Sequence, residues 1–552
     1  MSKKLKFAKT LPLLFILLIL YYPLLHLFTE IYSSNISTLP RILLNVFSDS
    51  YYLDVIFFSF WQALISTLGV LILVFPCCYA LVNYKFPGKS VLLASLTVPF
   101  IMPPIILVLG LMQILGNDGF ISGFLIEKFN LDISLNKLFG TAYLILAAHI
   151  IYEFSIVLRI LYTFWSNLDP DIERAAKILG SSPISTFIHV TFPILFPVMI
   201  AAASLVFIFS FCSFGIILIL GGGNFSNLET EIYYSATRFF QIPTAVVLSM
   251  IQMVIIFATL LIYIKIQNRV TRSISLVSHN ISRAKGIQVN SLPIMIVLSF
   301  VAMCVLLPFL SLGVSSVINE GELDFTAYIS IFFNQQDSVF FVSPVVSIYN
   351  SVGFATLTVL LSVPLGLVIS YILRAQQYSN RSILDAVYML PLGISSITLG
   401  LALLLSLSFN FFDLRSTWVP LVLAHVLIAY PFVMRIIFPS LNSIDSLLID
   451  SAKVLGASPK RIFWSVEFPI ISRPILVSCI FAFAISIGEF GASLLISRPE
   501  HTTIPVAIFH YLSRPGQYNL DNAVALSTLL MIIAGSGFLL IEKIRFKGWG
   551  DF

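Results

Sequence analysis

Charged residues are scarce in this sequence: they make up only 10% of its 552 residues, while 58% are hydrophobic. Soluble domains typically carry about 25% charged residues. The deficit, together with apolar runs of about 20 residues, excludes an ordinary soluble protein and predicts helices that cross a membrane. The runs are continuous rather than alternating, so a transmembrane β-barrel is excluded as well.

Patterns of catalysis and metal binding are also lacking. The five cysteines lie inside apolar runs, and none has a Cys-x-x-Cys or Cys/His spacing, so no metal site, disulfide framework or cofactor is predicted. The chain has no Gly-x4-Gly-Lys-Ser/Thr phosphate loop, so ATP hydrolysis is expected on a separate chain. No Ser/His/Asp order, His-Glu-x-x-His pattern or catalytic carboxylate pair stands out. We therefore predict that the chain is not an enzyme.

The apolar runs predict about twelve transmembrane helices and an all-α integral membrane fold. The spans are expected at residues 11–28, 55–83, 91–115, 140–165, 197–220, 243–266, 292–313, 346–373, 383–410, 417–440, 474–497 and 521–542. The first resembles a signal peptide, but its length and the absence of an Ala-x-Ala site favour a retained helix.

The positive charges predict the orientation of the chain. Most of the 31 lysines and arginines fall in the segments on the same side as both termini. The positive-inside rule therefore predicts a multi-pass protein of the bacterial cytoplasmic (inner) membrane with both termini in the cytoplasm. The same distribution accounts for the net charge of +5 without a nucleic-acid partner, leaving the lipid bilayer as the surrounding partner.

The two halves of the sequence repeat each other in the same orientation. His149 matches His425, and Arg159 matches Arg435, at one constant offset of 276 residues. Six spans in each half make the repeats parallel, related by an axis along the membrane normal. We predict a first half at 1–270 and a second half at 291–552. A polar and basic cytoplasmic linker is expected between them, at 271–290.

One patterned loop recurs in each half, at 167–193 and at 443–469. In the first loop Asp169 is a good N-cap, Gly180 is placed to end the helix, and Ser182-Pro183 begins the next one. The second loop repeats this design with Ser443 and Asp445 near the cap, Gly456 as the stop and Ser458-Pro459 as the restart. The pattern predicts a short helix, a glycine corner and a second helix, forming a protrusion suited to docking on a partner.

These loops resemble the "EAA" motif of ABC-importer permeases, Glu-Ala-Ala-x3-Gly-x9-Ile-x-Leu-Pro. The matching positions hold Ala175, Ala176, Gly180, Val190, Phe192 and Pro193 in the first half, and Asp450, Ser451, Ala452, Gly456, Val466, Phe468 and Pro469 in the second. The first half departs from the motif, because Arg174 occupies the acid position and Glu173 precedes it.

The fused arrangement of two halves is similar to the permeases of Fe(III) and thiamine importers. That resemblance implies the type I importer permease fold, two cytosolic ABC ATPase subunits docked on the loops, and an extracytoplasmic substrate-binding protein. It also implies that the chain forms the substrate path, with Fe(III) or thiamine as substrate. The alternative is a secondary active transporter without an ATPase, against which the duplicated loops argue.

Polar groups inside the spans are candidates for the path. His149 and His425 occupy the same place in each half, and Glu489 lies in or near a span of the second. Intramembrane ionisable residues often line a pathway. They also form hydrogen bonds between packed helices, which is the competing interpretation and the favoured one for the two histidines.

Overall fold

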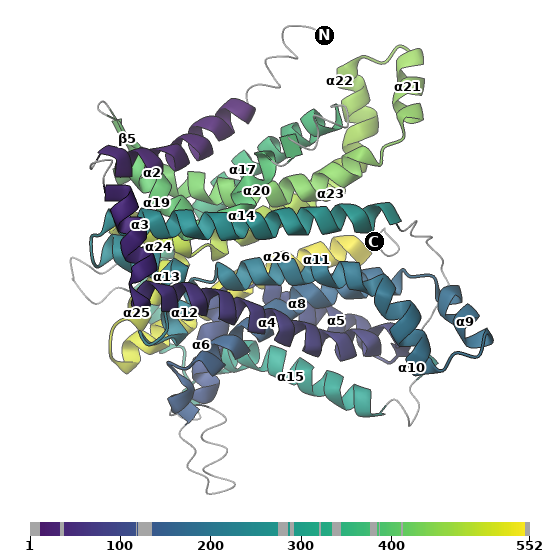
Figure 1. Cartoon of the computed structure of the whole chain (residues 1–552), viewed down its shortest axis with the longest axis horizontal. Coiled ribbons are helices and arrows are strands. Elements are labelled where there is room, and N and C mark those ends of the chain that lie inside the picture. Colours follow the sequence, from purple (N-terminus) through teal and green to yellow (C-terminus); the bar gives the residue numbers. More distant parts are fainter. Residues whose placement is uncertain are drawn as a thin grey trace, which may run out of the picture. The chain divides into compact units, whose positions relative to one another are not determined.

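The computed structural model of the chain is helical throughout its membrane-spanning part (Figure 1). It describes residues 12–33, 38–116, 119, 135–273, 285–286, 292–319, 322–333, 344–375, 384–385, 387–409 and 412–546. Within these ranges nine helices are long and apolar enough to cross a membrane, and two bent helix pairs raise the number to eleven. A shorter apolar helix, Pro12–Leu27, lies where the first span was expected. The prediction of about twelve spans is confirmed.

The nine long spans are Ser50–Asn83, Ala142–Ser166, Pro183–Phe211, Ile242–Ile262, Leu292–Ser315, Pro344–Arg374, Val419–Asn442, Pro459–Gly488 and Gln517–Gly537.

The chain divides into two compact units. The N unit comprises residues 46–231, 250–322 and 549–552, and the C unit comprises residues 1–45, 232–249 and 323–548. Each unit therefore contains chain from both halves of the sequence.

The elements of the N unit are α4 (Ser50–Asn83), β1 (Tyr84–Lys85), α5 (Lys89–Thr97), η2 (Val98–Phe100), α6 (Pro104–Leu115), η3 (Leu135–Leu138), α8 (Ala142–Ser166), α9 (Pro170–Ile178), α10 (Pro183–Thr186), η4 (Phe187–Thr191), α11 (Phe192–Phe211), α12 (Gly215–Leu220), β2 (Lys285–Gly286), α15 (Leu292–Ser315) and β3 (Ile318–Asn319).

The elements of the C unit are η1 (Leu17–Tyr21), α2 (Tyr22–Ser33), α16 (Thr326–Phe332), α17 (Pro344–Arg374), η6 (Leu390–Gly393), α19 (Ser396–Ser406), β5 (Ser408–Phe409), β6 (Phe412–Asp413), η7 (Leu414–Ser416), α20 (Val419–Asn442), α21 (Ser446–Val454), α22 (Pro459–Ile462), η8 (Phe463–Glu467), α23 (Phe468–Gly488), α24 (Gly491–Ile496), η9 (Pro499–His501), α25 (Ile504–Leu512) and α26 (Gln517–Phe546).

Four elements cross the boundary between the units: α3 (Thr38–Ser48), α13 (Leu228–Thr237), α14 (Ile242–Ser273) and β4 (Glu322–Leu323).

Each unit buries the first span of the opposite half. In the N unit, α15 packs on α4 and α6, and its Leu298, Val301 and Val305 join the same core as Val70 and Val74 of α4. In the C unit, α2 packs on α19. The halves predicted at 1–270 and 291–552 thus describe the repeat in the sequence, while packing follows a different division. Most of the predicted linker, 271–290, lies outside the described residues; its Lys285–Gly286 pairs in parallel with Tyr84–Lys85.

Two predicted spans are not single straight helices. The span expected at 91–115 bends by 105° between Phe100 and Pro104, and the span expected at 383–410 bends by 109° between η6 and α19. Proline explains the first break, because it cannot donate a backbone hydrogen bond within a helix and Pro103 and Pro104 stand where α6 begins. At the second, the Ser395 hydroxyl caps α19 by accepting from the Thr398 N–H.

Two further predicted spans, 197–220 and 474–497, also break within the expected range. The helix of the first ends at Phe211 and resumes as α12, and the helix of the second ends at Gly488 and resumes as α24. Both helices begin earlier than expected, since the continuous spans are Pro183–Phe211 and Pro459–Gly488. The two patterned loops therefore run directly into transmembrane helices.

Candidate functional site

Both patterned loops begin with the predicted aspartate cap. The Asp169 carboxylate accepts a hydrogen bond from the backbone N–H two residues later, at the start of α9, and Asp445 does the same at the start of α21, each at 2.9 Å. Such a cap satisfies one of the N–H groups that the first turn of a helix leaves without a partner. The shared cap fixes where each short helix starts.

Both short helices end at the predicted glycine. Gly180 has a φ of +87° and Gly456 a φ of +77°, in the left-handed region that penalises side chains. The N–H of the residue after each glycine donates to the carbonyl of Ala176 or Ala452, at 3.1 and 3.0 Å. The glycine N–H groups donate to the carbonyls of Lys177 and Lys453, at 3.0 and 2.9 Å, which completes a Schellman corner. The predicted corners are confirmed in both loops.

In both loops the chain then returns to the membrane through a serine-capped helix and a π-helical segment. Ser182 and Ser458 cap α10 and α22. Each helix passes through a five-residue π-helical segment, η4 or η8, before α11 or α23 continues into the bundle. Pro193 and Pro469 are the second residues of α11 and α23 and are exposed.

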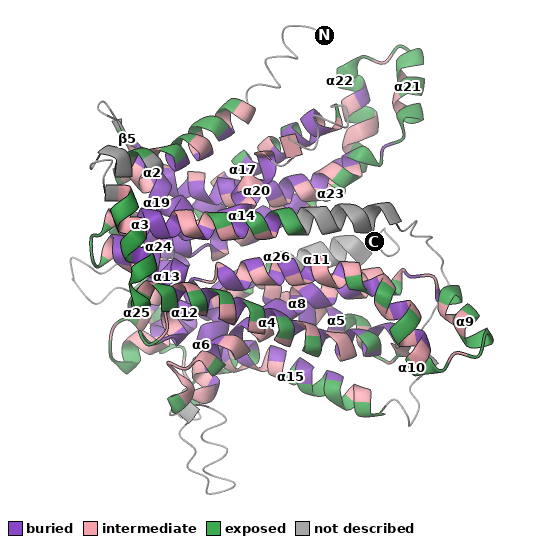
Figure 2. Cartoon of the chain, in the orientation of Figure 1, coloured by how far each residue is buried: buried purple, intermediate pink, exposed green. Residues whose placement is uncertain are grey.

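Large apolar side chains are exposed at both corners. Ile178 and Leu179 in the first loop, and Val454 and Leu455 in the second, are each between 86 and 88% exposed. Figure 2 shows α9 and α21 as largely exposed elements beyond the ends of the long helices of their own units. Burying a side chain of this type stabilises by about 1.5–3 kcal/mol. The same exposed apolar pair therefore recurs at the equivalent corner of each loop.

Charged side chains differ between the two loops. Asp450 is exposed and pairs with Lys453 at 2.8 Å, which leaves its carboxylate accessible to a partner. Glu173 instead accepts a hydrogen bond from the Thr191 hydroxyl at 2.6 Å and lies partly buried against η4. Arg174, which stands at the acid position, pairs with Asp171 at 2.8 Å. The displaced acid of the first half therefore serves an internal contact.

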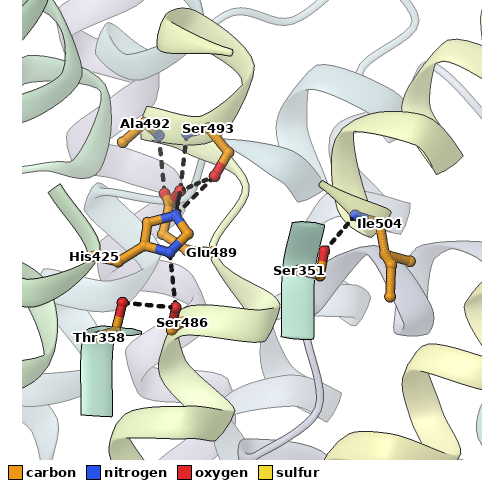
Figure 3. A network of polar contacts seen from close by, with 8 residues as sticks. All are labelled: Ser351, Thr358, His425, Ser486, Glu489, Ala492, Ser493 and Ile504. Atoms are coloured by element: carbon orange, nitrogen blue, oxygen red, sulfur yellow. Dashed lines mark hydrogen bonds and ion pairs between the residues drawn. The ribbon is translucent and has the colours of Figure 1, made fainter. Parts of the chain in front are cut away.

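A buried polar network lies in the C unit at the break between α23 and α24 (Figure 3). His425 contacts the Ser486 hydroxyl through Nδ1 at 2.7 Å and the Ser493 hydroxyl through Nε2 at 3.0 Å. Its Nε2 also lies 3.4 Å from a carboxylate oxygen of Glu489. The Ser486 hydroxyl donates in turn to Thr358, 3.2 Å away on α17.

Glu489 also caps α24. Its two carboxylate oxygens accept from the N–H groups of Ala492 and Ser493 at 2.8 and 2.9 Å, and from the Ser493 hydroxyl at 2.7 Å (Figure 3). A negative charge at a helix N-terminus is favoured by the helix dipole. The network thus joins α17, α20, α23 and α24. Sequence reasoning singled out His425 and Glu489 but missed the three hydroxyl partners, because serine and threonine within apolar spans carry no distinguishing pattern.

The N unit arranges the equivalent residues differently. His149 is buried, and neither of its ring nitrogens has a hydrogen-bond partner within the described part of the chain. Ser210, the counterpart of Ser486, donates to the carboxylate of Glu153 at 2.7 and 2.8 Å instead. Both Glu153 and His149 lie on α8, one turn apart. The structure brings His425 and Glu489 together, whereas His149 takes no part in a comparable network.

Comparisons with known proteins agree with this architecture. Residues 72–272 and 362–542 both match the sequence profile of the binding-protein-dependent transport system inner membrane component. The two matched regions correspond to the two halves of the repeat, and each contains one of the patterned loops.

Named relatives cover most of the chain. The thiamine transport system permease protein of Escherichia coli K12 is 26% identical over 90% of each chain. The ferric transport system permease protein of Actinobacillus pleuropneumoniae is 22% identical over 96% of this chain and 77% of its own length. The molybdenum transport system permease protein of Haemophilus influenzae is 30% identical over 30% of this chain and 79% of its own length.

Proposed function

Since the chain belongs to the family of binding-protein-dependent transport system inner membrane components, we propose that it is the permease subunit of an ATP-binding-cassette importer. In this proposal it works with two cytosolic ATPase subunits and an extracytoplasmic substrate-binding protein. The ATPases act on separate chains, because this sequence has no phosphate-binding loop. The permease forms the path and converts ATP hydrolysis elsewhere into transport.

The observation that carries the proposal is the pair of docking loops. Each presents an ordered corner with two exposed apolar side chains, Ile178 and Leu179 or Val454 and Leu455. Two equivalent protrusions suit two copies of one partner, since a parallel repeat presents the same surface twice. The residues expected to contact the partner are those at the motif positions of both loops: Glu173, Ala175, Ala176, Gly180, Pro193, Asp450, Ala452, Gly456 and Pro469.

We place the loops and both termini in the cytoplasm, as the distribution of lysine and arginine predicts. A cysteine introduced at Gly286 should resist an impermeant thiol reagent in intact cells, while one at Gly223 should react. Lys9 and Lys547, which lie outside the described residues, are suitable places for terminal tags and should behave as Gly286 does. Labelling of the cysteine at position 286 and protection of the one at position 223 would show that the chain has the opposite orientation.

Fe(III) or thiamine is the proposed substrate, because relatives named for thiamine and ferric transport align with nearly the whole chain. Uptake of each compound into proteoliposomes, with the matching binding protein outside and the ATPase and ATP inside, separates the two. The path itself is proposed to involve Glu489, His149 and His425. Their side chains are buried within one unit or the other, and the contacts of His425 and Glu489 equally suit a role in helix packing.

The test of the whole proposal is purification of the full-length chain from its native membrane, followed by identification of its stoichiometric partners. Recovery of an ABC ATPase, and uptake that stops when ATP is withheld, is the expected result. Uptake that persists without ATP and collapses with the ion gradient would instead favour a secondary active transporter.

A further inference from the structure

The two docking loops join the membrane through equivalent π-helical segments, η4 at Phe187–Thr191 and η8 at Phe463–Glu467. π-Helical turns are rare, are frequently found at functional sites and can kink a helix. The last residue of each segment is Thr191 or Glu467, and the two positions are equivalent by the constant offset of the repeat. The side chain at this shared position is bound in both halves, but to different parts of the protein.

In the first half, the tie stays within the loop. The Thr191 hydroxyl donates to Glu173 on the docking helix α9 at 2.6 Å. Towards the bundle, the segment packs on an aromatic cluster: the ring of Phe187 lies 5.5 Å from that of Phe75 on α4 and 6.3 Å from that of Trp165 on α8. Aromatic packing of this kind is weakly directional.

In the second half, the tie runs to a transmembrane helix. Glu467 accepts a hydrogen bond from the Tyr371 hydroxyl at 2.8 Å and pairs with the Arg374 guanidinium at 3.1 Å. Both partners lie on the last turn of α17. The side chains of Arg374 and Glu467 are only 21 and 13% exposed, whereas those of the pairs Arg174–Asp171 and Lys453–Asp450 on the two loops are between 55 and 62% exposed.

The length of α17 makes this contact possible. Pro76 and Pro364 are equivalent, so the last residue of α4, Asn83, corresponds to Tyr371. The second-half helix continues for nearly one more turn, and that turn carries Arg374. An apolar cluster supports the same junction, where Ile444 and Ile471 pack against Tyr371 and Ile449 of the docking helix α21.

We propose that Arg374 and Glu467 are positioning residues that latch the second docking loop to α17. The inference rests on the proposed function, in which the loops carry force from the ATPases. In the first half, Thr191 moves together with the loop, because it is bound to Glu173 of the loop itself. In the second half, Glu467 is bound to Arg374 and Tyr371 of α17, so a movement of the second loop is passed directly to α17. The two loops therefore couple to the membrane in unequal ways.

A charged pair suits this role better than packing alone. A half-buried ion pair with a hydroxyl donor fixes both distance and direction, whereas an aromatic cluster tolerates sliding. The guanidinium of Arg374 also lies 3.5 Å from the carbonyl of Ile444, at the entrance to the loop. The latch thus touches the residues on both sides of α21.

The test uses the full-length chain in lipid nanodiscs and measures backbone hydrogen exchange in peptides that cover 463–467 and 187–191. Arg374→Gln and Glu467→Gln should each speed exchange at 463–467 about fivefold, which corresponds to about 1 kcal/mol, and leave 187–191 unchanged. The charge exchange R374E with E467R should return the rate to within about twofold of the original. Thr191→Val is the matched control and should change 187–191 alone.

A second readout addresses coupling. In the complex with the two ATPase subunits and the binding protein, Arg374→Gln should lower the ratio of substrate-stimulated to basal ATP hydrolysis about fivefold, with subunit association unchanged. Unaltered exchange at 463–467 in both single variants, or failure of the charge exchange to restore it, would overturn the latch. If the unmodified chain bound no ATPase subunit, the proposed function would be overturned instead. The hydrogen-exchange data would still show whether Arg374 and Glu467 hold the loop to α17.

Discussion

His149 and His425 occupy equivalent positions in two repeated halves, yet their surroundings have diverged. His425 is held by two hydroxyls and lies beside the carboxylate of Glu489, whereas the ring nitrogens of His149 have no partner among the described residues. The carboxylate of the first half stands elsewhere, at Glu153, and takes the serine that would otherwise serve the histidine. Duplication has preserved the positions of the histidine and the serine, while the carboxylate stands at a different position in each half and the hydrogen bonds differ accordingly.

The docking loops show the same divergence at another level. The caps and glycine corners are nearly identical, but the residues that anchor the foot of each loop differ in charge and in partner. A feature determined within a few residues, such as a Schellman corner, survives duplication easily. A feature determined by packing between distant helices has changed. The predictions below test how far this contrast extends, from the largest expected effect to the smallest.

Replacing each of the two histidines should give the largest difference in stability between equivalent changes in the two halves. His425→Leu leaves the buried carboxylate of Glu489 and two hydroxyls with fewer partners, and should lower the free energy of unfolding by about 3 kcal/mol. The ring of His149 has no hydrogen-bond partner among the described residues, so His149→Leu should change the free energy of unfolding by less than about 1 kcal/mol. Thermal unfolding in matched detergent or nanodisc samples measures both. Equal losses would mean that His149 has a polar partner in the membrane.

Valine at the glycine corners should damage both loops equally. A side chain in the left-handed region costs about 1–2 kcal/mol, and a Cβ at Gly180 or Gly456 would have no neighbouring atom of the described residues within 4 Å, so no clash is added. We expect Gly456→Val and Gly180→Val each to insert normally and to lose most ATPase association in a pull-down. Asparagine tolerates this backbone conformation, so Gly456→Asn should retain most of it. A valine variant that still binds at full strength would remove the corner from the docking surface.

Exposed apolar side chains at the corners should contribute next. Serine at Val454 and Leu455 removes apolar surface that the partner covers, without disturbing the fold, because both side chains are already exposed. The dissociation constant for the ATPase should rise about tenfold, or about 1.4 kcal/mol. The same change at Ile178 and Leu179 should match it if the two partners are identical. Unchanged affinity in both double variants would show that another surface makes the contact.

The acids of the two loops should give the smallest and most informative difference. Asp450→Asn should weaken ATPase association by at most about fivefold while leaving hydrogen exchange in its own loop unchanged, because exposed pairs contribute only about 0–1 kcal/mol. Glu173→Gln should instead speed exchange at 187–191, since it weakens the bond to Thr191. If Glu173→Gln affects association more than Asp450→Asn, the displaced acid of the first half contacts the partner after all.

Local features of the loops could be predicted from the sequence, because caps and glycine stops depend on residues a few positions apart. Asp169, Gly180, Asp445 and Gly456 all stand where the pattern placed them. The number of spans could be predicted too, since hydrophobic length is measured along the chain. The prolines Pro103, Pro104 and Pro391 indicate that both bent spans are kinked, but hydropathy along the chain does not predict bends as large as 105° and 109°.

Contacts between distant segments could not be predicted in the same way. Nothing near Glu467 indicates that its partner is Arg374, almost a hundred residues earlier, and nothing near His425 indicates Ser486. Such pairs depend on which helices pack together, and hydrophobic periodicity reports only that a helix is buried.

The crossed packing of the first spans has a consequence for how the protein is made. The helix α2 is synthesised long before α19, Ser396–Ser406, against which it packs. The helix α2 must therefore wait in the membrane without its neighbour while the residues between it and α19, more than half of the 552, are translated. The N unit likewise stays open until α15 has been synthesised. Because domains generally fold as units in order of synthesis, neither unit can close before the other half has started, and fusion of the halves ensures that the missing helix arrives on the same chain.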